Sequence, residues 1–363
     1  MDSLREPQEN GAKRPTGVPP GNASKVAVVV NGNAKSVTSE VIATLDEILD
    51  SGDLYVSRRI EDSASIAKTL LDRGYDTILT GGGDGTFTVV VTAVVREAKA
   101  RGIPYPRFGL LRLGTGNSLA WVVGASKTGG GKRAAGALSA DLARLKSDAG
   151  SRPLPLVEVE NTLSPFCGFG IDANVLHDYG VTKGFLAKGP LARIAPGIVS
   201  YAIAATTRTI PSYLLKSAPH CRIINRGGEA FRIGDAGRVR PGSFANGEVM
   251  YEGPATIACL STIPYYGFGF RMFPWAAERE GKMQLRVSTI SSVLFVKNFP
   301  AIWRGEYQNP EALFDFFVDA VEIQMDPATN FQIGGDIQGA RTQVLARLHE
   351  PVPVVDFYAP PRA

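Results

Sequence analysis

Residues 80–86, which read Thr-Gly-Gly-Gly-Asp-Gly-Thr, constrain the fold of this chain more than any other segment. The apolar run 77–79 before them indicates a buried strand, and the run 87–95 after them indicates the opening of a helix. Glycines at such a junction let backbone N–H groups approach a bulky anion, and the helix N-terminus adds positive potential. A tight turn without a ligand is the alternative, but average glycine and aspartate usage makes this segment rare by chance. The segment therefore predicts a phosphate site.

One carboxylate, that of Asp84, lies among these glycines. A carboxylate beside a phosphate is unfavourable unless a cation lies between them, and Mg²⁺ is the cation that protein carboxylates share with phosphates. We therefore predict that Asp84 holds Mg²⁺, directly or through water. The N–H groups of the loop are expected to cradle the phosphates together with the hydroxyls of Thr86 and Thr88.

The first half of the chain alternates strands with helices. We expect strands at 25–30, 54–57, 76–80 and 108–111, and helices at 36–49, 63–73, 86–100, 117–123 and 133–146. This order predicts an α/β domain, with a mostly parallel sheet and helices on both faces. Ligands of such sheets bind at the carboxyl ends of the strands, where residues 80–86 lie.

After about residue 150 the pattern changes to short β-rich runs separated by turn signals. We expect strands at 154–159, 221–224, 254–260, 283–287, 320–324, 331–333 and 342–348, and one long helix at 191–207. These runs predict an antiparallel, β-sandwich-like second domain. The final run, 353–357, is expected to return to the first domain. The predicted organisation is a disordered tail at 1–24, a nucleotide-binding domain at 25–150 completed by 350–360, and a β-rich domain at 151–349.

Composition limits the classes of partner and compartment. The chain has 363 residues, of which 44% are hydrophobic, and its net charge of only +4 does not suggest a nucleic-acid ligand. Its three cysteines are odd in number and widely spaced, which favours reduced thiols that fill the core of a cytoplasmic protein. Residues 1–24 contain no apolar core of signal-peptide length, and no stretch is apolar for long enough to span a membrane.

Residues 113–117, Leu-Gly-Thr-Gly-Asn, form a second strand–glycine–helix junction in the same half of the chain. Because the carboxyl ends of neighbouring parallel strands share one edge, the two glycine segments are expected to face each other across a crevice. We predict that Gly114, Thr115 and Gly116 bind a nucleotide. Asn117 has two open roles, which are capping of the helix that follows and contact with the ligand.

Two further polar segments end strands at the same edge. Asn31, Asn33 and Lys35 follow the first strand, and Ser57 ends the second. Asparagine in such a place is often only a turn former, but the neighbouring glycine segments favour nucleotide contact. The predicted nucleotide-binding residues are thus Asn31, Asn33, Lys35, Ser57, Gly82, Gly83, Asp84, Gly85, Thr86, Thr88, Gly114, Thr115, Gly116 and Asn117.

The pairing of Gly-Gly-Asp-Gly-Thr at 82–86 with Leu-Gly-Thr-Gly-Asn at 113–117 resembles the diacylglycerol kinase catalytic-domain family, which includes bacterial lipid kinases and the sphingosine and ceramide kinases. The resemblance runs from about 25 to 357 and is strongest over 76–120. It implies ATP and Mg²⁺ as cofactors and transfer of the γ-phosphoryl group to a hydroxyl of diacylglycerol or a related lipid. Residues 167–173 look like the stretch that begins the family's second domain. Residues 31–35 stand where the family has Asn-Pro-x-Ser-Gly, and Ser57 stands where it has Thr.

The resemblance also implies catalytic roles near the C-terminus. Family members carry Asp-Gly-Glu, whose last carboxylate is taken as the general base for the lipid hydroxyl, whereas this chain has Gly-Gly-Asp at 334–336. Asp336 is then the predicted base, one methylene shorter, and Asp84 is the second catalytic carboxylate. A plain β-turn is the alternative reading of 334–336. Glu280 with Gly281 looks like the family's Asp-Gly turn, so Glu280 joins Asp84 as a predicted metal residue.

The acceptor side is indicated by six aromatic residues within eleven positions, which are Tyr265, Tyr266, Phe268, Phe270, Phe273 and Trp275. Core packing explains most such residues, and a lipid-chain pocket or a lip on a membrane surface is the alternative. The apolar run 191–207 has the same two readings. The expected partners are a lipid substrate and a membrane surface, which predicts a cytoplasmic protein that associates peripherally with membranes. A homodimer is an assembly that the sequence leaves open.

Two other functions compete with a lipid kinase. NAD kinases share Gly-Gly-Asp-Gly-Thr and a similar two-domain plan, but residues 113–117 follow the lipid-kinase pattern, and no clear Asn-Glu pair follows the first glycine segment. A nucleotide sensor without activity is the second alternative, because the sequence departs from the family at Gly32, Glu280 and 334–336.

Overall fold

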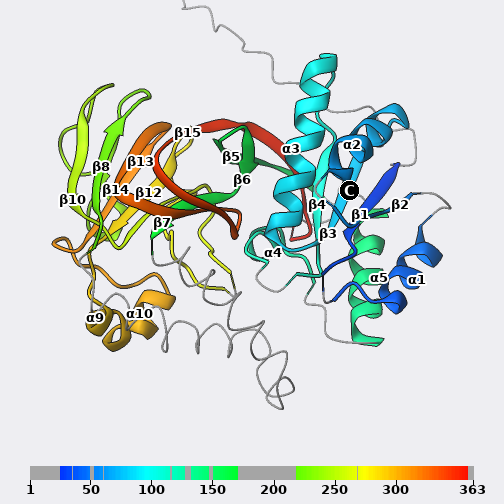
Figure 1. Ribbon diagram of the computed structural model, residues 1–363. Coiled ribbons are helices and arrows are strands. Elements are labelled where there is room, and N and C mark those ends of the chain that lie inside the picture. The colour runs from blue at the N-terminus through cyan, green and yellow to red at the C-terminus, as the bar shows by residue number, and fades with distance from the viewer. Residues whose placement is uncertain are drawn as a thin grey trace, which may run out of the picture.

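The computed structural model describes residues 25–34, 36–49, 53–59, 61–114, 117–126, 132–146, 150–170, 218–267 and 269–358. The helix expected at 191–207 and the predicted site residues Lys35, Thr115 and Gly116 lie outside this part of the chain, as does Phe268. Figure 1 shows an α/β part and a β-rich part side by side, joined by strands that run from one to the other.

Four parallel strands form the sheet of the α/β part, in the order β2-β1-β3-β4. They are β1 (Val26–Asn31), β2 (Leu54–Ser57), β3 (Thr77–Gly82) and β4 (Arg107–Arg112). Val29 of β1 pairs with Tyr55 on one side and with Thr80 on the other. All six residues of β3 are buried, as expected for a central parallel strand with helices over both faces.

The helices of this part lie in two pairs. The elements are α1 (Ser39–Ile48), α2 (Asp62–Asp72), α3 (Asp84–Arg101), α4 (Ala120–Val123) and α5 (Lys132–Lys146). α2 packs on α3 and α1 packs on α5, and the two pairs cover opposite faces of the sheet (Figure 1). The Thr38 hydroxyl caps α1 by accepting from the Val41 N–H, and α3 ends at Gly102, whose φ is +66°. The expected α/β fold of this half is confirmed.

The core of the α/β part lies between α3 and the sheet. Phe87 and Val91 of α3 are fully buried, and the ring of Phe87 meets that of Phe108 edge to face. Burial of one such side chain contributes about 1.5–3 kcal/mol to stability. This packing fixes the orientation of α3, and therefore the direction in which its N-terminus points.

The β-rich part is antiparallel, as expected. Its elements are β5 (Gly150–Val159), β6 (Thr162–Ser164), β7 (Phe166–Gly170), β8 (His220–Asn225), β9 (Phe231–Ile233), β10 (Val249–Pro254), β11 (Ile257–Ser261), β12 (Met283–Ser288), α9 (Ser292–Lys297), α10 (Phe299–Trp303), β13 (Leu313–Val318), β14 (Ala320–Ile333) and β15 (Asp336–Asp356). A second core, separate from that of the α/β part, lies along these strands and includes Phe169, Leu285 and Phe331. Cys167, Cys221 and Cys259 are buried free thiols, which confirms their expected role as core residues.

The strands differ from the expectation in two ways. The runs 320–324 and 331–333 belong to one long strand, β14, which continues through 326–328 with a shift of register, and the runs 342–348 and 353–357 likewise merge in β15. In addition, the sequence did not predict β6, β7, β9, β10 and β13.

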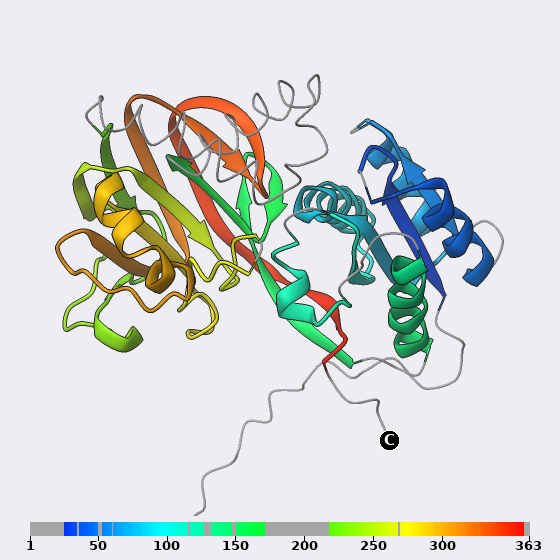
Figure 2. The ribbon, with the colours of Figure 1, turned by 90° about the horizontal axis from the view of Figure 1, so that it is seen from below.

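One strand, β15, connects the two parts. It pairs antiparallel with β14 and β5, and near its end Val354 pairs in parallel with Phe108 of β4. The final run therefore lies beside the first sheet, and the described strands form a single mixed sheet of 15 strands (Figure 2). The division of the chain into domains at residue 150 stays a prediction.

Candidate functional site

The two glycine segments meet through their backbones at the carboxyl ends of β3 and β4. A Cβ atom on Gly114 would collide with the backbone of Gly83, and a Cβ on Gly82 would collide with the side chain of Thr86. Glycine is therefore required at 114 for the two loops to approach each other, and at 82 for the first segment to fold back on Thr86. The expectation that the two segments face one another is confirmed by this contact.

Asp84 is the first residue of α3 and is almost fully buried, with 7% of its surface exposed. Its two carboxylate oxygens accept the backbone N–H groups of Ser118 at 2.8 Å and Leu119 at 3.0 Å. Burial raises the pKa of Asp84, and the hydrogen bonds from Leu119 and Ser118 oppose that shift. Asp84 thus ties the second glycine segment to α3, a structural role that the motif alone did not indicate. Each oxygen keeps a second lone pair, so the predicted contact with Mg²⁺ stays a prediction.

Asn117 adopts a φ of +48°, and its side chain bonds within its own turn. Its amide oxygen accepts the N–H of Gly114 at 3.2 Å, and its amide nitrogen donates to the carbonyl of Gly114. The side chain therefore shapes the Gly114 turn. These two bonds to the Gly114 backbone are those of a turn-forming asparagine, a residue type that tolerates the left-handed region.

The loops after β1 and β2 lie next to each other at the same edge of the sheet. The Asn31 side chain donates to the Thr86 hydroxyl at 3.4 Å and accepts the N–H of Asn33 at 2.9 Å. The Asn33 amide donates to the Arg58 carbonyl at 2.7 Å, and the Ser57 hydroxyl donates to the Arg59 carbonyl at 3.1 Å. Asn31 therefore reaches the glycine segment, while the Asn33 amide joins the β1 and β2 loops and the Ser57 hydroxyl bonds within the β2 loop.

Asp336 reaches the same place from the β-rich part. It follows the tight turn between β14 and β15, where Gly334 and Gly335 have φ values of +59° and +88°. A Cβ on Gly85 would collide with the Asp336 carboxylate, so this carboxylate lies against the first turn of α3. The residue as a whole is solvent-accessible, yet its carboxylate loses hydration against α3. That loss first, and the charge of Asp84 second, raise the pKa of Asp336.

Thr88, one helical turn after Asp84, links α3 to the turn between β14 and β15. Its hydroxyl donates to the Ser164 hydroxyl at 3.3 Å, and Ser164 in turn donates to the Phe166 carbonyl at 2.9 Å. The N–H of Gly334 also donates to the Phe166 carbonyl, at 3.0 Å. The predicted phosphate contact of Thr88 is not tested by these bonds, which show that the buried Thr88 links α3 to the β14–β15 turn.

Ser118 is a site residue that the sequence reasoning missed. It is fully buried, and its hydroxyl oxygen accepts the N–H of Gly267 at 2.6 Å while its own N–H donates to Asp84. It therefore connects Asp84 to the aromatic segment 265–275. No local sequence signal marks this serine, apart from its position directly after Asn117.

The aromatic segment divides into core and partly exposed residues. Phe273 is fully buried, and Tyr266 packs on Phe166 with ring centroids 4.8 Å apart, so core packing accounts for both. The ring of Tyr265 instead lies beside that of Trp121, with centroids 6.0 Å apart. Trp121 is 38% exposed, and the Arg112 guanidinium lies over its ring, 4.9 Å from the centroid. Trp121 follows the second glycine segment closely, and its size was a signal that the sequence reasoning did not use.

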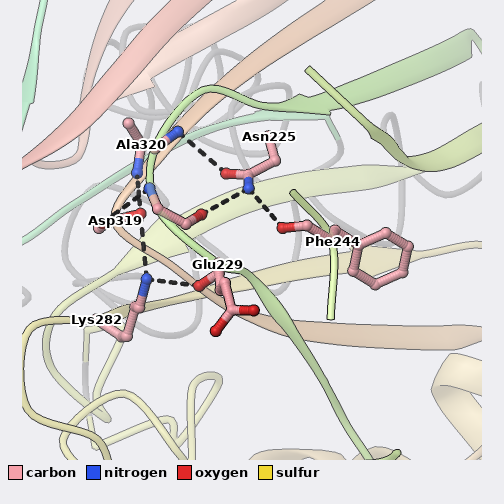
Figure 3. Close-up of polar contacts among 8 residues, drawn as sticks. Asn225, Glu229, Phe244, Lys282, Asp319 and Ala320 are labelled. Carbon is pink, nitrogen blue, oxygen red and sulfur yellow. Dashed lines mark hydrogen bonds and ion pairs between the residues drawn. The ribbon is translucent and has the colours of Figure 1, made fainter. Parts of the chain in front are cut away.

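Glu280 is not brought to this site. It is exposed in the turn before β12, and its neighbour Lys282 forms an ion pair with Asp319 at 3.2 Å and donates to the Glu229 carbonyl at 2.7 Å (Figure 3). Asp319 also accepts the N–H of Gly228 at 3.3 Å. The predicted metal role of Glu280 stays a prediction. Among the residues that the structure describes, no three His, Cys, Asp or Glu side chains form a metal cluster.

The donors present fit a hard cation at the N-terminus of α3. Asp84 and Asp336 are two like charges that approach the same helical turn, and the charge of Asp84 raises the pKa of Asp336. A divalent cation near both would relieve this repulsion, and carboxylate oxygens are the ligands that Mg²⁺ prefers. The glycine backbone beside them offers N–H groups to phosphate oxygens.

Comparison with known proteins identifies the α/β part. Residues 25–146 match the diacylglycerol kinase catalytic domain family. The "Probable lipid kinase YegS-like" protein of Enterobacter sp. (strain 638) is 33% identical over 97 residues, which is 25% of this chain and 31% of that protein. The match therefore spans about a third of the relative's length. The resemblance seen in the motifs is confirmed over residues 25–146.

Two solved structures share the fold over nearly the whole chain. One is described as a "putative diacylglycerol kinase from Bacillus anthracis str. Sterne"; it has a TM-score of 0.58 and 14% identity and covers 92% of this chain and 96% of its own. Another structure of a diacylglycerol kinase from the same organism has a TM-score of 0.54 and 13% identity and covers 92% and 97%. At these identities the likeness concerns the fold alone. Within the described ranges, no helix has the length and apolar character needed to cross a bilayer.

Proposed function

Because residues 25–146 match a diacylglycerol kinase catalytic domain, we propose that this protein transfers the γ-phosphoryl group of ATP to a hydroxyl of diacylglycerol or a related lipid. One observation carries the proposal. The Asp336 carboxylate, from the β-rich part, lies against Gly85 in the first turn of α3, beside Asp84. A base and a phosphate-binding helix end are the two elements that phosphoryl transfer to an alcohol needs in one place.

The α/β part supplies the nucleotide side of the site. The first N–H groups of α3 have no acceptor inside the helix, and together with the helix dipole they favour a phosphate group at this end. The glycines at 82, 83 and 114 keep side chains away from that position. Asp84, with Asp336 close by, would hold Mg²⁺, which when bound neutralises charge that develops on the phosphate oxygens.

The β-rich part supplies the acceptor side. Asp336 is placed to take the proton of an alcohol that approaches the N-terminus of α3, and its raised pKa makes its carboxylate a stronger base than an ordinary aspartate. The apolar pair Trp121 and Tyr265 lies beside the second glycine segment, where it offers a surface to the chains of a lipid.

A transfer assay with radiolabelled ATP and short-chain diacylglycerol in mixed micelles tests the proposal. We expect product with the unchanged chain, and Asp336→Asn should lower kcat by about 10²- to 10⁴-fold, because an amide cannot accept the proton. Asp326→Asn, an exposed change on β14, is the matched control and should leave kcat unchanged. The same assay offers NAD as acceptor, and transfer to NAD in preference to lipid would contradict the proposal. Turnover of the Asp336→Asn variant at the rate of the control would remove Asp336 from the mechanism.

A further inference from the structure

A cavity separate from the candidate active site lies at the outer edge of the β-rich part. It is a shallow crevice with about 40 Å³ of free volume, partly open to solvent, and is lined by β9 and the strand-like segment opposite it, by Pro274 and Trp275, and by Gly305 and residues 307–310, which follow α10. Its walls carry Arg232, Arg240, Tyr307 and Asn309. This volume is far below that of sites that enclose a whole small molecule, so a ligand would meet these groups from the solvent side.

Two arginines in this cavity face each other across an antiparallel ladder. The Arg240 N–H donates to the Arg232 carbonyl at 2.9 Å, and Ile233 forms a bridge with Val239, so residues 232 and 240 are directly opposite. Their side chains therefore emerge on the same face of the ladder, an arrangement that is destabilising for two like charges. Gly234 makes room for Arg240, whose Cγ would lie 2.9 Å from a Cβ at that position.

Neither arginine forms an ion pair with any residue that the structure describes. The Arg232 guanidinium lies over the Phe314 ring at 5.2 Å and donates to the Pro310 carbonyl at 3.4 Å. Burial, and after it the charge of Arg240, lower the pKa of Arg232. The positive charge of the pair is thus held in partly desolvated surroundings without an anion, and P–O⁻ groups are the partners that guanidinium groups bind best.

The acidic residues near the cavity do not neutralise the pair. Asp315 forms an ion pair with Arg286, whose Nε and Nη2 donate to the two carboxylate oxygens at 2.8 and 2.9 Å. The Gln284 amide also donates to Asp315, at 2.8 Å. Asp235 is exposed at the lining of the cavity and makes no ion pair with Arg232 or Arg240 within the described ranges. The cavity therefore keeps a net positive face.

Exposed apolar side chains lie on α9 and α10, the two helices that precede the cavity wall in the chain. Val293, Leu294 and Phe299 of α9 and α10 are 65%, 39% and 41% exposed, and α9 and α10 lie side by side at the edge of the β-rich part (Figure 1). The chain passes from the end of α10 directly into the cavity wall. Proteins bind anionic membrane surfaces through two contributions, which are apolar side chains that enter the interface and cationic groups that contact lipid headgroups. The exposed residues of α9 and α10 would supply the first, and the two arginines the second.

We propose that the cavity walled by Arg232 and Arg240 binds the phosphate group of an anionic membrane phospholipid, while the exposed apolar residues of α9 and α10 enter the surface of the same membrane. This second site is distinct from the Asp84–Asp336 centre and holds the protein on the membrane rather than taking part in phosphoryl transfer. It does not depend on turnover, so binding can be measured without ATP.

Vesicle co-sedimentation of the full chain tests the site, with vesicles of phosphatidylcholine alone or mixed with phosphatidylglycerol and without diacylglycerol or ATP. We expect preferential binding to the mixed vesicles. Arg240→Gln should lower the partition coefficient at least about tenfold, because a bidentate phosphate contact is lost. Arg238→Gln is the matched control, since Arg238 is two residues away but does not line the cavity. It should lower binding by less than about fivefold, the effect of one charge near an anionic surface.

The two variants also separate binding from folding. Arg240→Gln should leave Tm unchanged or raise it, because it removes the repulsion from Arg232, and Arg240→Lys should recover only part of the binding. Phe299→Ser should weaken binding to both kinds of vesicle. Equal losses in Arg240→Gln and Arg238→Gln would overturn the proposal in favour of diffuse charge attraction. Binding of inorganic phosphate that depends on Arg240, with vesicle binding that does not, would overturn it in favour of a soluble phosphate compound.

Discussion

Asp84 has one observed role, and a second role is proposed for the same carboxylate. The sequence predicts a cation ligand from its position among glycines, and the structure adds that both oxygens accept backbone N–H groups of Ser118 and Leu119, directly after the second glycine segment. The prediction of a cation ligand rests on a local motif. The observed role depends on the packing of residues 118–119 against α3, which no pattern within 80–86 records.

The paired carboxylates give the activity a specific dependence on pH. Asp336 must be deprotonated to act as base, and burial and the charge of Asp84 raise its pKa above that of an ordinary aspartate, about 3.9. Activity should therefore be complete above the raised pKa and fall as pH is lowered through it. We expect the acidic limb of the kcat/KM profile to lie at higher pH than the titration of an ordinary aspartate, and to move to lower pH as free Mg²⁺ is increased, because the cation offsets the charge of Asp84.

The profile is measured at several fixed Mg²⁺ concentrations, with Asp336→Glu as the control that keeps a titrating carboxylate at the position. An acidic limb near the value of an ordinary aspartate, unchanged by Mg²⁺, would show that the two carboxylates do not interact in the working enzyme.

At the scale of elements, strands buried on both faces and helices with regular apolar spacing were predicted well. β14 was predicted as two strands because residues 326–328, Asp-Pro-Ala, carry an Asp-Pro turn signal, whereas the ladder resumes beyond them with Thr329 opposite Arg341. β7 was missed because Phe-Cys-Gly-Phe-Gly has the glycine content of a turn, and its burial comes from β11 and β14 on either side.

The turn between β14 and β15 is the element that places Asp336, and Gly334 tests it. A Cβ there would lie 2.6 Å from the Thr88 hydroxyl oxygen, and φ is +59°. Gly334→Ala should cost about 1–2 kcal/mol in backbone strain and should also push the turn away from α3, so that kcat falls at least about tenfold through misplacement of the base.

Gly339→Ala is the control for strain alone, because Gly339 lies on the same hairpin with φ +84° and nothing closer than 3.6 Å to its Cβ position. Thermal unfolding and kcat are measured for both. We expect a loss of Tm in both variants, larger in Gly334→Ala because of its contact with Thr88, and a loss of kcat only in Gly334→Ala. Equal kcat values in the two variants would mean that the turn does not position Asp336.

At the scale of the whole molecule, the two parts share one sheet, yet the site between them depends on side-chain links. β15 carries the ladder from β14 to β4, and the Thr88–Ser164 and Ser118–Gly267 bonds join α3 and the second glycine segment to the β-rich part. The sequence predicted both halves of the site through motifs. It could not predict the links, because Ser118 and Gly267 are 149 residues apart and neither is marked locally.

Ser118→Ala tests whether this link couples the nucleotide side to the acceptor side. The substitution keeps the N–H groups of residues 118 and 119 that Asp84 accepts. It removes the hydroxyl, which accepts the Gly267 N–H and also hydrogen-bonds to the Asp84 side chain. The unpaired Gly267 donor costs about 1–3 kcal/mol. Because the anchored segment carries Tyr265 and Tyr266, we expect the KM for lipid to rise by about tenfold while the KM for ATP changes by less than about twofold.

Ser288→Ala is the control, since that buried hydroxyl accepts a local N–H, from Ile290 at 3.2 Å. If both variants lower Tm and only Ser118→Ala changes the KM for lipid, the serine acts by positioning the acceptor segment; parallel changes in both KM values would instead mean that its loss disturbs Asp84.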